Sequence, residues 1–595
     1  MRLGICASKH GLQLLEPLLA SAELDAIAVP SHLLDPARPQ LIAASAGHRQ
    51  LLQQHWDQLE LLVACLAAGA LIRLMAPLLT DKAKDPAVLL LSGDGSLLLP
   101  LLGSHGAGGR AAAERLAPLL AAKLVSSGWS DSADLPPLDQ FGKGWGWQRN
   151  QAAWQQLMVQ TAAGAPLTVQ QECGQALALQ ALNEAGHQLV QVGSGEQTAL
   201  RVTAQLGSGC CWHPPVLWLG VGCERNTATE LVEAAVAEAL AKANLATEAV
   251  AGLASLNLKA DEPALLSLSN SRGWPLRLFT PEQLAPITVP NPSPVVQAAV
   301  GTASVAEAAA LKAAGGGAVL RLAKTVSSGG PGRGAVTVAI AEAAEPWAPQ
   351  RGQLQLIGSG PGAINQLTAA ARAALASARV WVGYGLYLDL LEPLRRGGQI
   401  RLDGNLTQER QRCRQALDLA CQGISVALVS SGDSGMYGMA GLALEEWLLL
   451  PEQERPSFAV HPGISAFQMA AARLGAPLMH DLCTVSLSDR LTPWPLIEQR
   501  LQAAARGDFV VALYNPRSQG RHWQLSRAIE LLLEHRPGAT PAAICRQLSR
   551  ADEQISLHTL AELPVERVDM FSLVLVGNST TCNQGGLLLT PRGYN

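Results

Sequence analysis

A glycine-flanked acid follows a strongly apolar stretch in the second half of the chain. Residues 426–431 read VALVSS, which suits the buried strand of a parallel sheet, and Gly432-Asp433-Ser434-Gly435 then breaks that strand. Open α/β sheets bind ligands at this end of their strands. The glycines let the backbone approach a ligand closely while the Asp433 carboxylate reaches it. The same residues also fit a tight turn capped by Asp433, so other stretches must decide between these two interpretations.

A second glycine-rich loop, GSGPG at residues 358–362, lies between an expected strand, QLQLIG, and a helix expected over residues 366–375. It superficially matches a dinucleotide-binding loop. However, Pro361 sits inside the loop, and about twenty residues further on the sequence reads ARVWVG, without the acid that would bind the ribose of NAD. The loop therefore binds or shapes something other than a dinucleotide.

Further punctuated stretches end or join expected strands in the same half. Each stretch alone is typical of a turn. Only the order and spacing of the stretches together can indicate a function. They are HPGISA at 461–466, SLSD at 486–489 before TPW at 492–494, ALYNPR at 512–517, and GNST at 577–580.

The first half has one comparable feature, the turn GSHGAGG at residues 103–109 before an alanine-rich helix. A glycine-rich turn with a histidine at a helix amino terminus suits an anion or a carbonyl group, because free N–H groups point at the ligand. His105 taken alone is more often a turn or capping residue.

The elements that must position these loops alternate between strand and helix patterns along the chain. This alternation predicts a multidomain α/β protein with Rossmann-like layered domains in its first part. After a segment with two prolines and no periodicity, the pattern restarts as if at the beginning of a protein, which indicates a fusion of two enzymes. The expected parts are an α/β domain at 1–125, a small mixed domain at 126–215, an α/β domain at 216–341, a linker at 342–352, and a two-subdomain enzyme at 353–595 with its internal boundary near 460.

Composition limits the classes of partner. A net charge of −4 gives no sign of a nucleic-acid partner. Local arginines, Arg395-Arg396 and Arg517 with Arg521, still allow an acidic substrate. No 18-residue run lacks polar residues and no cleavable leader is visible at Met1, so we expect a cytoplasmic protein without a membrane span. The 11 cysteines form no C-x-x-C pair, which favours buried thiols over disulfides or a metal site.

Taken together, the loops of residues 353–595 resemble the tetrapyrrole methylases, S-adenosyl-L-methionine enzymes with two α/β subdomains and an active site between them. Within that family, SSGDSGMYGM, SLSDRLTPW, ALYNPRSQGR and VDMFSLVLVGNS are similar to the precorrin-3B C(17)-methyltransferases, which contract the ring during corrin synthesis. The first loop departs from the family pattern, because Ala363 stands where these enzymes usually carry Asp.

The resemblance implies roles for individual residues. Asp433 would orient the donor or the substrate, and the ring contraction needs a general acid or base, for which Ser430, Ser431, Ser488 and Asp489 are candidates. Arg490, Arg517 and Arg521 either hold substrate carboxylates, which a guanidinium pairs with bidentately, or are solvated surface arginines. The implied methyl-donor contacts are Gly358, Gly360, Pro361, Gly432, Asp433, Gly435, Met436, Tyr437, Gly463, Ser465, Ala466, Leu513, Tyr514, Asn578 and Ser579.

In the first half, the stretches IRLMAPLLTDKAKDPAV, LGVGCERNTATELV, ASLNLKADEPALL and VGTASVAEAAAL resemble the cobalt-precorrin-5A hydrolases. Those enzymes open the lactone formed during ring contraction and release acetaldehyde. Lactone opening needs an activated water and stabilisation of an oxyanion. The resemblance makes His105 a candidate base and Lys259 or Arg225 a candidate for stabilising charge, while Glu262 is either a base or a residue that begins a helix.

The resulting hypothesis is a bifunctional enzyme of corrin synthesis that acts on a polycarboxylate tetrapyrrole. S-adenosyl-L-methionine is its methyl donor, cobalt enters only as part of the substrate, and the methylase half is expected to form a homodimer. Two alternatives stay open from the sequence: a methylase that acts at another ring position, and a non-catalytic tetrapyrrole-binding protein.

Overall fold

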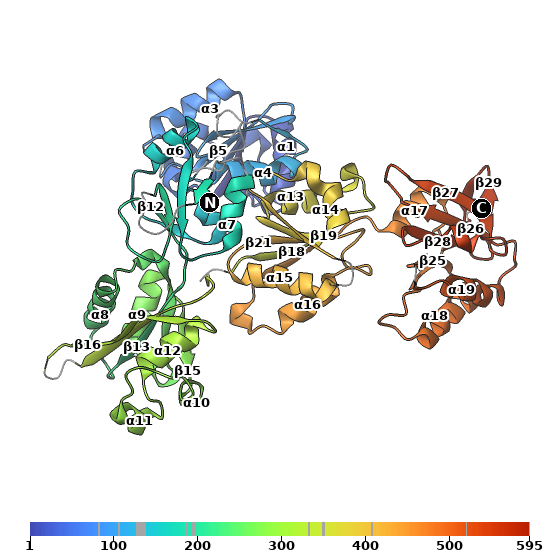
Figure 1. The fold of residues 1–595 in the computed structure, drawn as a ribbon. Helices are drawn as coiled ribbons and strands as arrows, with labels where there is room; N and C mark the ends of the chain where they lie inside the picture. The colour runs from blue at the N-terminus through green and yellow to red at the C-terminus, as the bar shows by residue number, and fades with distance from the viewer. Residues whose placement is uncertain are drawn as a thin grey trace.

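Short runs of Leu, Val and Ala form the central strand of each sheet, and amphipathic helices cover the faces (Figure 1). The computed structural model describes residues 1–80, 84–104, 107–125, 138–184, 189–191, 198–330, 334–347, 351–405, 408–518 and 520–593.

The amino-terminal domain is Rossmann-like, as its sequence predicts. Its strand order is β3-β2-β1-β4-β5-β6-β7, with β1 to β5 parallel and β6 antiparallel to β5. Separate apolar clusters fill its two faces. The elements are β1 (Arg2–Cys6), α1 (Lys9–Ala20), β2 (Ala26–Val29), β3 (Leu41–Ala43), α2 (His48–His55), β4 (Leu61–Cys65), α3 (Ala68–Met75), β5 (Ala87–Leu91), β6 (Leu97–Leu102), α4 (Gly109–Leu119) and β7 (Lys123–Leu124).

The middle domain has a small sheet in the order β10-β9-β11-β12-β8, parallel except at β8. Trp145, Trp147, Trp154 and Trp212 are buried in its core. Its elements are β8 (Gln148–Arg149), α6 (Trp154–Ala162), β9 (Leu167–Gln171), α7 (Ala176–Glu184), β10 (Leu189–Gln191), β11 (Leu200–Val202) and β12 (Cys210–His213).

The third domain has the strand order β15-β14-β13-β17-β16, in which β13, β14 and β15 are parallel. A long helix-like stretch at 295–311 is interrupted, because Gly301 takes a φ of +77° and ends the first of two helices. The elements are β13 (Leu217–Cys223), α8 (Thr229–Lys242), β14 (Val250–Leu256), α9 (Pro263–Arg272), β15 (Leu276–Phe279), α10 (Pro281–Leu284), α11 (Pro294–Val300), α12 (Val305–Ala314), β16 (Val319–Ser328) and β17 (Ala335–Glu342).

The first subdomain of the second enzyme has a fully parallel sheet in the order β20-β19-β21-β18-β22. The three strands that precede the glycine-rich loops are therefore neighbours. The elements are β18 (Gln353–Gly358), α13 (Ala369–Ser377), β19 (Val380–Tyr384), α14 (Gly385–Leu391), β20 (Ile400–Gly404), α15 (Glu409–Cys421), β21 (Ser425–Ser430), α16 (Ala440–Leu448) and β22 (Ser457–His461).

The second subdomain has a mixed sheet in the order β24-β25-β28-β26-β27, beside a small sheet of β23, β30 and β29. Only β24 and β25 are parallel in the larger sheet. Its elements are α17 (Ala466–Leu474), β23 (Gly475–Ala476), β24 (Leu482–Ser486), α18 (Trp494–Arg506), β25 (Val510–Tyr514), α19 (Gln524–Leu533), β26 (Pro541–Arg546), β27 (Gln554–Thr559), β28 (Ser572–Val576), β29 (Cys582–Gln584) and β30 (Leu587–Leu589).

The first enzyme packs against the first subdomain of the second. The alanine-rich helices α4 and α13 lie against each other, and one apolar cluster contains side chains of both the middle domain and the β18–β21 sheet (Figure 1). Small side chains allow two helices to approach closely and so bury their backbones. The fusion is therefore a docked assembly rather than two enzymes on a loose tether.

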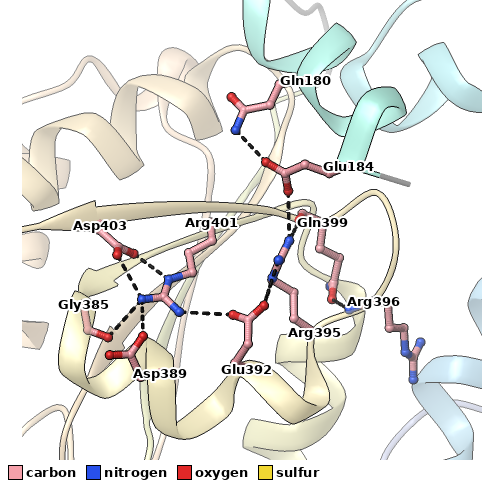
Figure 2. A network of polar contacts seen from close by, with 10 residues as sticks. All are labelled: Gln180, Glu184, Gly385, Asp389, Glu392, Arg395, Arg396, Gln399, Arg401 and Asp403. Carbon is pink, nitrogen blue, oxygen red and sulfur yellow. Dashed lines mark hydrogen bonds and ion pairs between the residues drawn. The ribbon is translucent and has the colours of Figure 1, made fainter. Parts of the chain in front are cut away.

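Two adjacent arginines fasten this interface. Arg395 pairs with Glu184 of the middle domain at 2.9 Å, and Arg396 pairs with Glu114 of α4 at 2.8 Å. Figure 2 shows the Arg395 guanidinium between Glu184 and Glu392, while Arg401 binds Glu392 from the other side. The sequence left this arginine pair open to an acidic substrate, but both guanidinium groups are occupied by carboxylates of the chain itself.

The segment expected as a linker also takes part in packing. The N–H of Trp347 donates to the carbonyl of Pro215 at 2.8 Å, and its ring lies between the guanidinium groups of Arg277 and Arg351. Arg277 in turn pairs with Glu454 of the second enzyme at 3.0 Å. The absence of periodicity in this segment thus does not mean that its described residues are free.

Within the described ranges, no single helix is both long and apolar enough to cross a membrane. One bent pair, α11 with α12, meets the length and composition requirement jointly, with a 74° angle at the break.

Cutting the chain tests the docked arrangement. With a protease site inserted between Trp347 and Arg351, the two fragments should still co-elute in size-exclusion chromatography after cleavage, because apolar packing and ion pairs hold them together. The double variant Glu114→Arg/Glu184→Arg should separate, since it places like charges against Arg396 and Arg395.

Glu16→Arg/Glu60→Arg provides a matched control, because these two glutamates pair inside the amino-terminal domain with Arg38 and with the chain's amino terminus. Immediate separation of the unmodified fragments at micromolar concentration would contradict the docked arrangement.

Candidate functional site

Three glycines meet at the carboxyl edge of the β18–β21–β22 sheet. Gly358 ends β18, Gly432 follows β21, and Gly463 follows β22. A Cβ at Gly463 would lie 2.1 Å from the carbonyl oxygen of Gly432 and 2.6 Å from that of Gly358. A Cβ at Gly358 would lie 2.5 Å from the backbone nitrogen of Gly463. Backbone contacts backbone here, so no side chain fits at these positions.

Hydrogen bonds join the same loops. Gly360 and Gly432 exchange backbone bonds, N to O, at 3.0 and 2.8 Å. Both residues have positive φ, +71° and +62°, which glycine adopts without steric cost. Pro361 follows Gly360 in the first loop. Because of the two backbone bonds, the glycine-rich loops predicted from the sequence form one paired structure.

Asp433 locks this structure with its side chain. Its Oδ1 accepts the N–H of Gly435 at 2.9 Å, and its Oδ2 accepts the N–H of Gly463 at 3.0 Å. The first bond is the local turn that the simpler interpretation of the sequence required. The second joins the loop after β21 to the loop after β22, so the carboxylate holds two ligand loops in register.

Two serines flank this acid. The Ser434 side chain is buried, and its hydroxyl has no hydrogen-bond partner among the described residues. Ser431 is half-buried at the end of the strand, and the hydroxyl of its neighbour Ser430 accepts the N–H of Met439 at 3.3 Å. A buried hydroxyl without a partner beside close-packed backbones fits a small ligand that is bound largely through backbone groups.

Tyr437 carries this loop across to the second subdomain. Its hydroxyl donates to the carbonyl of Thr484 in β24 at 3.0 Å, and its ring centroid lies 5.1 Å from that of Tyr514 at the end of β25. Met436, the preceding residue, accepts a long contact from the Thr484 hydroxyl at 4.0 Å. Tyr437 has a φ of +53°, an uncommon conformation for a bulky residue. The site therefore lies between the two subdomains.

The turn after β22 also borders the place where the two subdomains meet. The N–H of Ser465 donates to Gln468 Oε1 at 2.9 Å at the start of α17, where Ala466 is the first helical residue. The Tyr514 hydroxyl accepts the N–H of Phe467 at 3.1 Å, and burial raises the pKa of this tyrosine to about 12. Leu513 is fully buried behind it. Tyr514 thus stays neutral at physiological pH.

Asn578 and Ser579 lie elsewhere. Strand β28 runs antiparallel to β25, so its carboxyl end is at the opposite edge of the sheet from Tyr514. There Ser579 bonds to Asp508, ahead of β25, through both its N–H and its hydroxyl, and Asn578 bonds to Thr580 and Thr581. The structure therefore does not bring these two predicted donor contacts to the site that gathers the others.

A second cluster lies at the carboxyl ends of β24 and β25. Arg521 is 8% exposed, and its Nη1 donates to the Ser488 hydroxyl at 3.4 Å. Asp489 accepts a bond from Gln524 at 3.0 Å. Burial lowers the pKa of Arg521, although the nearby Asp489 opposes the effect. Arg517, by contrast, donates to the carbonyl of Val565 at 2.8 Å, which occupies part of its guanidinium.

Sequence reasoning missed two residues that border the paired glycine-rich loops. Thr484 meets Tyr437, and the Arg550 side chain lies against Gly362, where a Cβ would be 2.8 Å from Arg550 Cγ. Neither residue belongs to one of the turn-like motifs that the sequence analysis singled out. Only the pairing of the subdomains brings them to the loops, so no signal along the chain could have identified them.

In the first enzyme, His105 lies outside the described residues. Lys259 is described: its Nζ contacts Glu262 Oε2 at 3.2 Å at the start of α9. Arg225 pairs with Asp261 and donates to the carbonyl of Leu258 at 2.7 Å. Lys259 and Arg225 thus belong to one group of charges at the carboxyl ends of β13 and β14.

Most of the cysteines are buried thiols, as the sequence predicts. All 11 are free thiols, and burial raises the pKa of several of them, including Cys6 to about 11 and Cys545 to about 12. The part of the chain that the structure describes contains no group of three His, Cys, Asp or Glu side chains arranged to hold a metal ion.

Family models match three stretches of the chain. Tetrapyrrole (Corrin/Porphyrin) Methylases matches residues 353–564, Cobalamin synthesis G N-terminal matches 50–131, and Cobalamin synthesis G C-terminus matches 217–341. These matches confirm the family resemblances found in both halves of the sequence and the fusion that they imply.

Curated relatives match the second enzyme. The probable cobalt-factor III C(17)-methyltransferase of Salmonella typhimurium is 46% identical over 241 residues, covering 40% of this chain and 99% of that protein. The precorrin-3B C(17)-methyltransferase of Sinorhizobium sp is 40% identical over 249 residues, covering 41% of this chain and 97% of that protein. The cobalt-factor III methyltransferase of Priestia megaterium is 42% identical over 248 residues, covering 41% of this chain and 45% of that protein.

The paired glycine loops between two α/β subdomains agree with these matches, and the expected fold class is confirmed. Because it covers nearly all of a relative with 46% identity, the chain belongs to the tetrapyrrole methylases, and it carries the cobalamin synthesis G segments ahead of the methylase.

Proposed function

We propose that this chain is a bifunctional enzyme of corrin synthesis. Its second half methylates carbon 17 of precorrin-3B or cobalt-factor III with contraction of the ring, and its first half hydrolyses the cobalt-precorrin-5A lactone with release of acetaldehyde. The printed names of the relatives support the first activity, and the two cobalamin synthesis G segments support the second. Cobalt enters only as part of the substrate.

The observation that carries the methylase proposal is the contact of Gly358, Gly432 and Gly463, locked by Asp433. Tetrapyrrole methylases use S-adenosyl-L-methionine, which supplies a methyl group already activated by its sulfonium. The protein has mainly to hold two molecules in line, and such alignment can be worth about 7 to 11 kcal/mol of the barrier. Loops that cannot move relative to one another are suited to this task.

The donor contacts of the proposal come from the loops that the structure gathers. The donor would contact the backbone of Gly358, Gly360, Pro361, Gly432 and Gly435. Tyr437 and Tyr514 lie against each other where the two subdomains meet. Asp433 acts as the positioning carboxylate rather than as a free ligand, since both its oxygens accept backbone N–H groups. Ser434, with its unpartnered hydroxyl, joins the set.

The tetrapyrrole carboxylates fit the second cluster. Arg521 is buried, and its Nε has no hydrogen-bond partner among the described residues, so the guanidinium keeps capacity for a carboxylate. Ser488 and Asp489 lie beside it and remain the candidates for proton transfer, together with Ser431 at the donor loop. Arg490 contributes positive charge to the same region.

Product analysis tests the function directly. The purified chain, incubated with labelled S-adenosyl-L-methionine and the ring-expanded trimethylated precursor with and without cobalt, should add one methyl group and yield a contracted ring with a lactone, as read by mass spectrometry. Methylation of a different ring carbon would contradict the proposed position, and donor binding without any methyl transfer would contradict the proposed substrate.

A glycine substitution tests the site. Gly463→Ala should abolish donor binding in calorimetry, because its Cβ would lie 2.1 Å from the Gly432 carbonyl oxygen and force the two loops apart. Gly441→Ala, in α16 with nothing within 4 Å of its Cβ, is the matched control. It should keep full affinity and stabilise the helix by about 0.5 to 1 kcal/mol. Unchanged affinity in Gly463→Ala would place the donor elsewhere.

We also propose that the methylase half forms a homodimer. Leu449 and Leu491, 76% and 98% exposed, are apolar side chains of this half that the single chain leaves uncovered. Light scattering should give twice the mass of one chain, and Leu491→Glu should leave the fold intact while shifting the equilibrium toward monomer if this residue is at the interface. A monomeric mass at micromolar concentration would remove this proposal.

A further inference from the structure

The third domain carries a cluster of charges where ligands bind in α/β sheets. Strands β13 and β14 are parallel neighbours, and the loops that follow them are clipped together by Arg225, which pairs with Asp261 and donates to the Leu258 carbonyl. Cys223 ends β13 beneath these loops. This is the carboxyl edge of the parallel part of the sheet, where open α/β sheets form their binding crevices.

Lys259 and Glu262 form the buried part of this cluster. The Nζ–Oε2 distance is 3.2 Å, and the side chains are 15% and 0% exposed. Glu262 Oε1 is also buried and has no hydrogen-bond partner among the described residues. Leaving such an oxygen unpaired costs free energy, and the cost is larger for a charged group than for a neutral one. A carboxylate that is needed only to begin a helix would not have to be buried.

A second fully buried glutamate of the same domain shows what a structural carboxylate looks like. Glu307 Oε1 accepts bonds from Asn291 Nδ2 at 2.8 Å and from the N–H of Lys324 at 2.9 Å, and its Oε2 accepts the N–H of Asn291 at 3.2 Å. Glu307 thus ties the loop that holds Asn291 to strand β16, with both oxygens satisfied. Glu262 instead accepts its one side-chain hydrogen bond within the described residues from Lys259, whose side chain is 15% exposed.

The remaining candidate nucleophile of the cluster is unsuited to covalent catalysis. Burial raises the pKa of the Cys223 thiol, an effect that the nearby Lys259 opposes and Glu262 reinforces. The thiol is therefore protonated at neutral pH, and thiolate rather than thiol is the attacking form. Hydrolysis at this place would use water directly.

We propose that Lys259 binds the carbonyl oxygen of the lactone in the hydrolytic half, and that Glu262 is the positioning residue that holds its ammonium in place. The assignment rests on the proposed lactone-opening function. Lys259 has three N–H donors, one of which is directed at Glu262, so donors remain for an oxygen that gains negative charge. Its neighbour Arg225 is paired with Asp261 and so leaves Lys259 as the cation of this cluster that faces the ligand.

The hydrolytic step balances without any further reagent. The oxygen of a water molecule bonds to the lactone acyl carbon, and the carbonyl oxygen becomes an oxyanion held by Lys259 Nζ. The bond between the acyl carbon and the ring alkoxy oxygen then breaks. One proton of the water goes to the alkoxide and the other to solvent, leaving a hydroxyl group and a carboxylate.

Four variants of the full chain test the assignment with the cobalt-precorrin-5A lactone as the probe. Lys259→Met should lower kcat for lactone opening about 100-fold, as loss of an oxyanion donor does, with KM little changed. Lys259→Arg should restore most of that loss, because the charge returns. Glu262→Gln should lower kcat by less, since an amide oxygen still accepts from Lys259. Glu307→Gln should lower the melting temperature and leave kcat unchanged below it.

Methyl transfer by each variant shows that its second half is folded, and the melting temperature of the first half shows whether the third domain is. Equal kcat in wild type and Lys259→Met would overturn the assignment while the proposed function stands. A wild-type chain that methylates its substrate but neither binds nor opens the lactone would overturn the hydrolytic function and the assignment together. A Glu262→Gln variant that loses methyl transfer and melting temperature as well would show that Glu262 is structural, like Glu307.

Discussion

Three adjacent strands end in glycines whose backbones touch, and the rest of the methylase half depends on that contact. A side chain at Gly358 or Gly463 would overlap backbone atoms of the other loops, so relief would require the strand ends to separate. Asp433 fixes their spacing with one bond to its own turn and one to the neighbouring loop. Tyr437 can reach Thr484 and Tyr514 only from this fixed base. The way in which the loop after β21 meets the second subdomain therefore follows from the absence of side chains at these glycines.

The same subdomain supports the other enzyme on a different surface. Helix α13, which covers one face of the β18–β21 sheet, presents small side chains to α4, and Arg395 and Arg396 reach carboxylates of two other domains. Each partly exposed ion pair contributes only about 0.2 to 1 kcal/mol to the stability of the docked arrangement. The shared apolar cluster contributes more and gives the ion pairs a fixed geometry. Docking rather than linker length consequently sets the distance between the two sites. The length of the linker therefore does not set the effective concentration of one site near the other.

Strands that end in glycine loops could be predicted from the sequence, because a buried parallel strand is a continuous apolar run and its end is a change of residue type. The loops after β18, β21 and β22 were expected for this reason. Direction within a sheet has no such signature. Asn578 and Ser579 follow an apolar run like the others, but β28 is antiparallel to β25, which carries them to the far edge. The break between α11 and α12 likewise depends on backbone conformation, because a positive φ at Gly301 ends α11 there.

The roles of charged residues are even harder to predict from the sequence than strand direction. The pair Arg395-Arg396 resembles a substrate-binding patch in sequence, and it becomes an internal fastening only because α4 and α7 lie opposite it. Glu262 and Glu307 both stand near helix starts and are both fully buried, so neither position nor burial separates them. The difference is the number of donors that the fold delivers to each carboxylate. Glu307 receives bonds at both oxygens, whereas Glu262 receives only the ammonium of Lys259 among the described groups, so the two carboxylates differ only once the chain is folded.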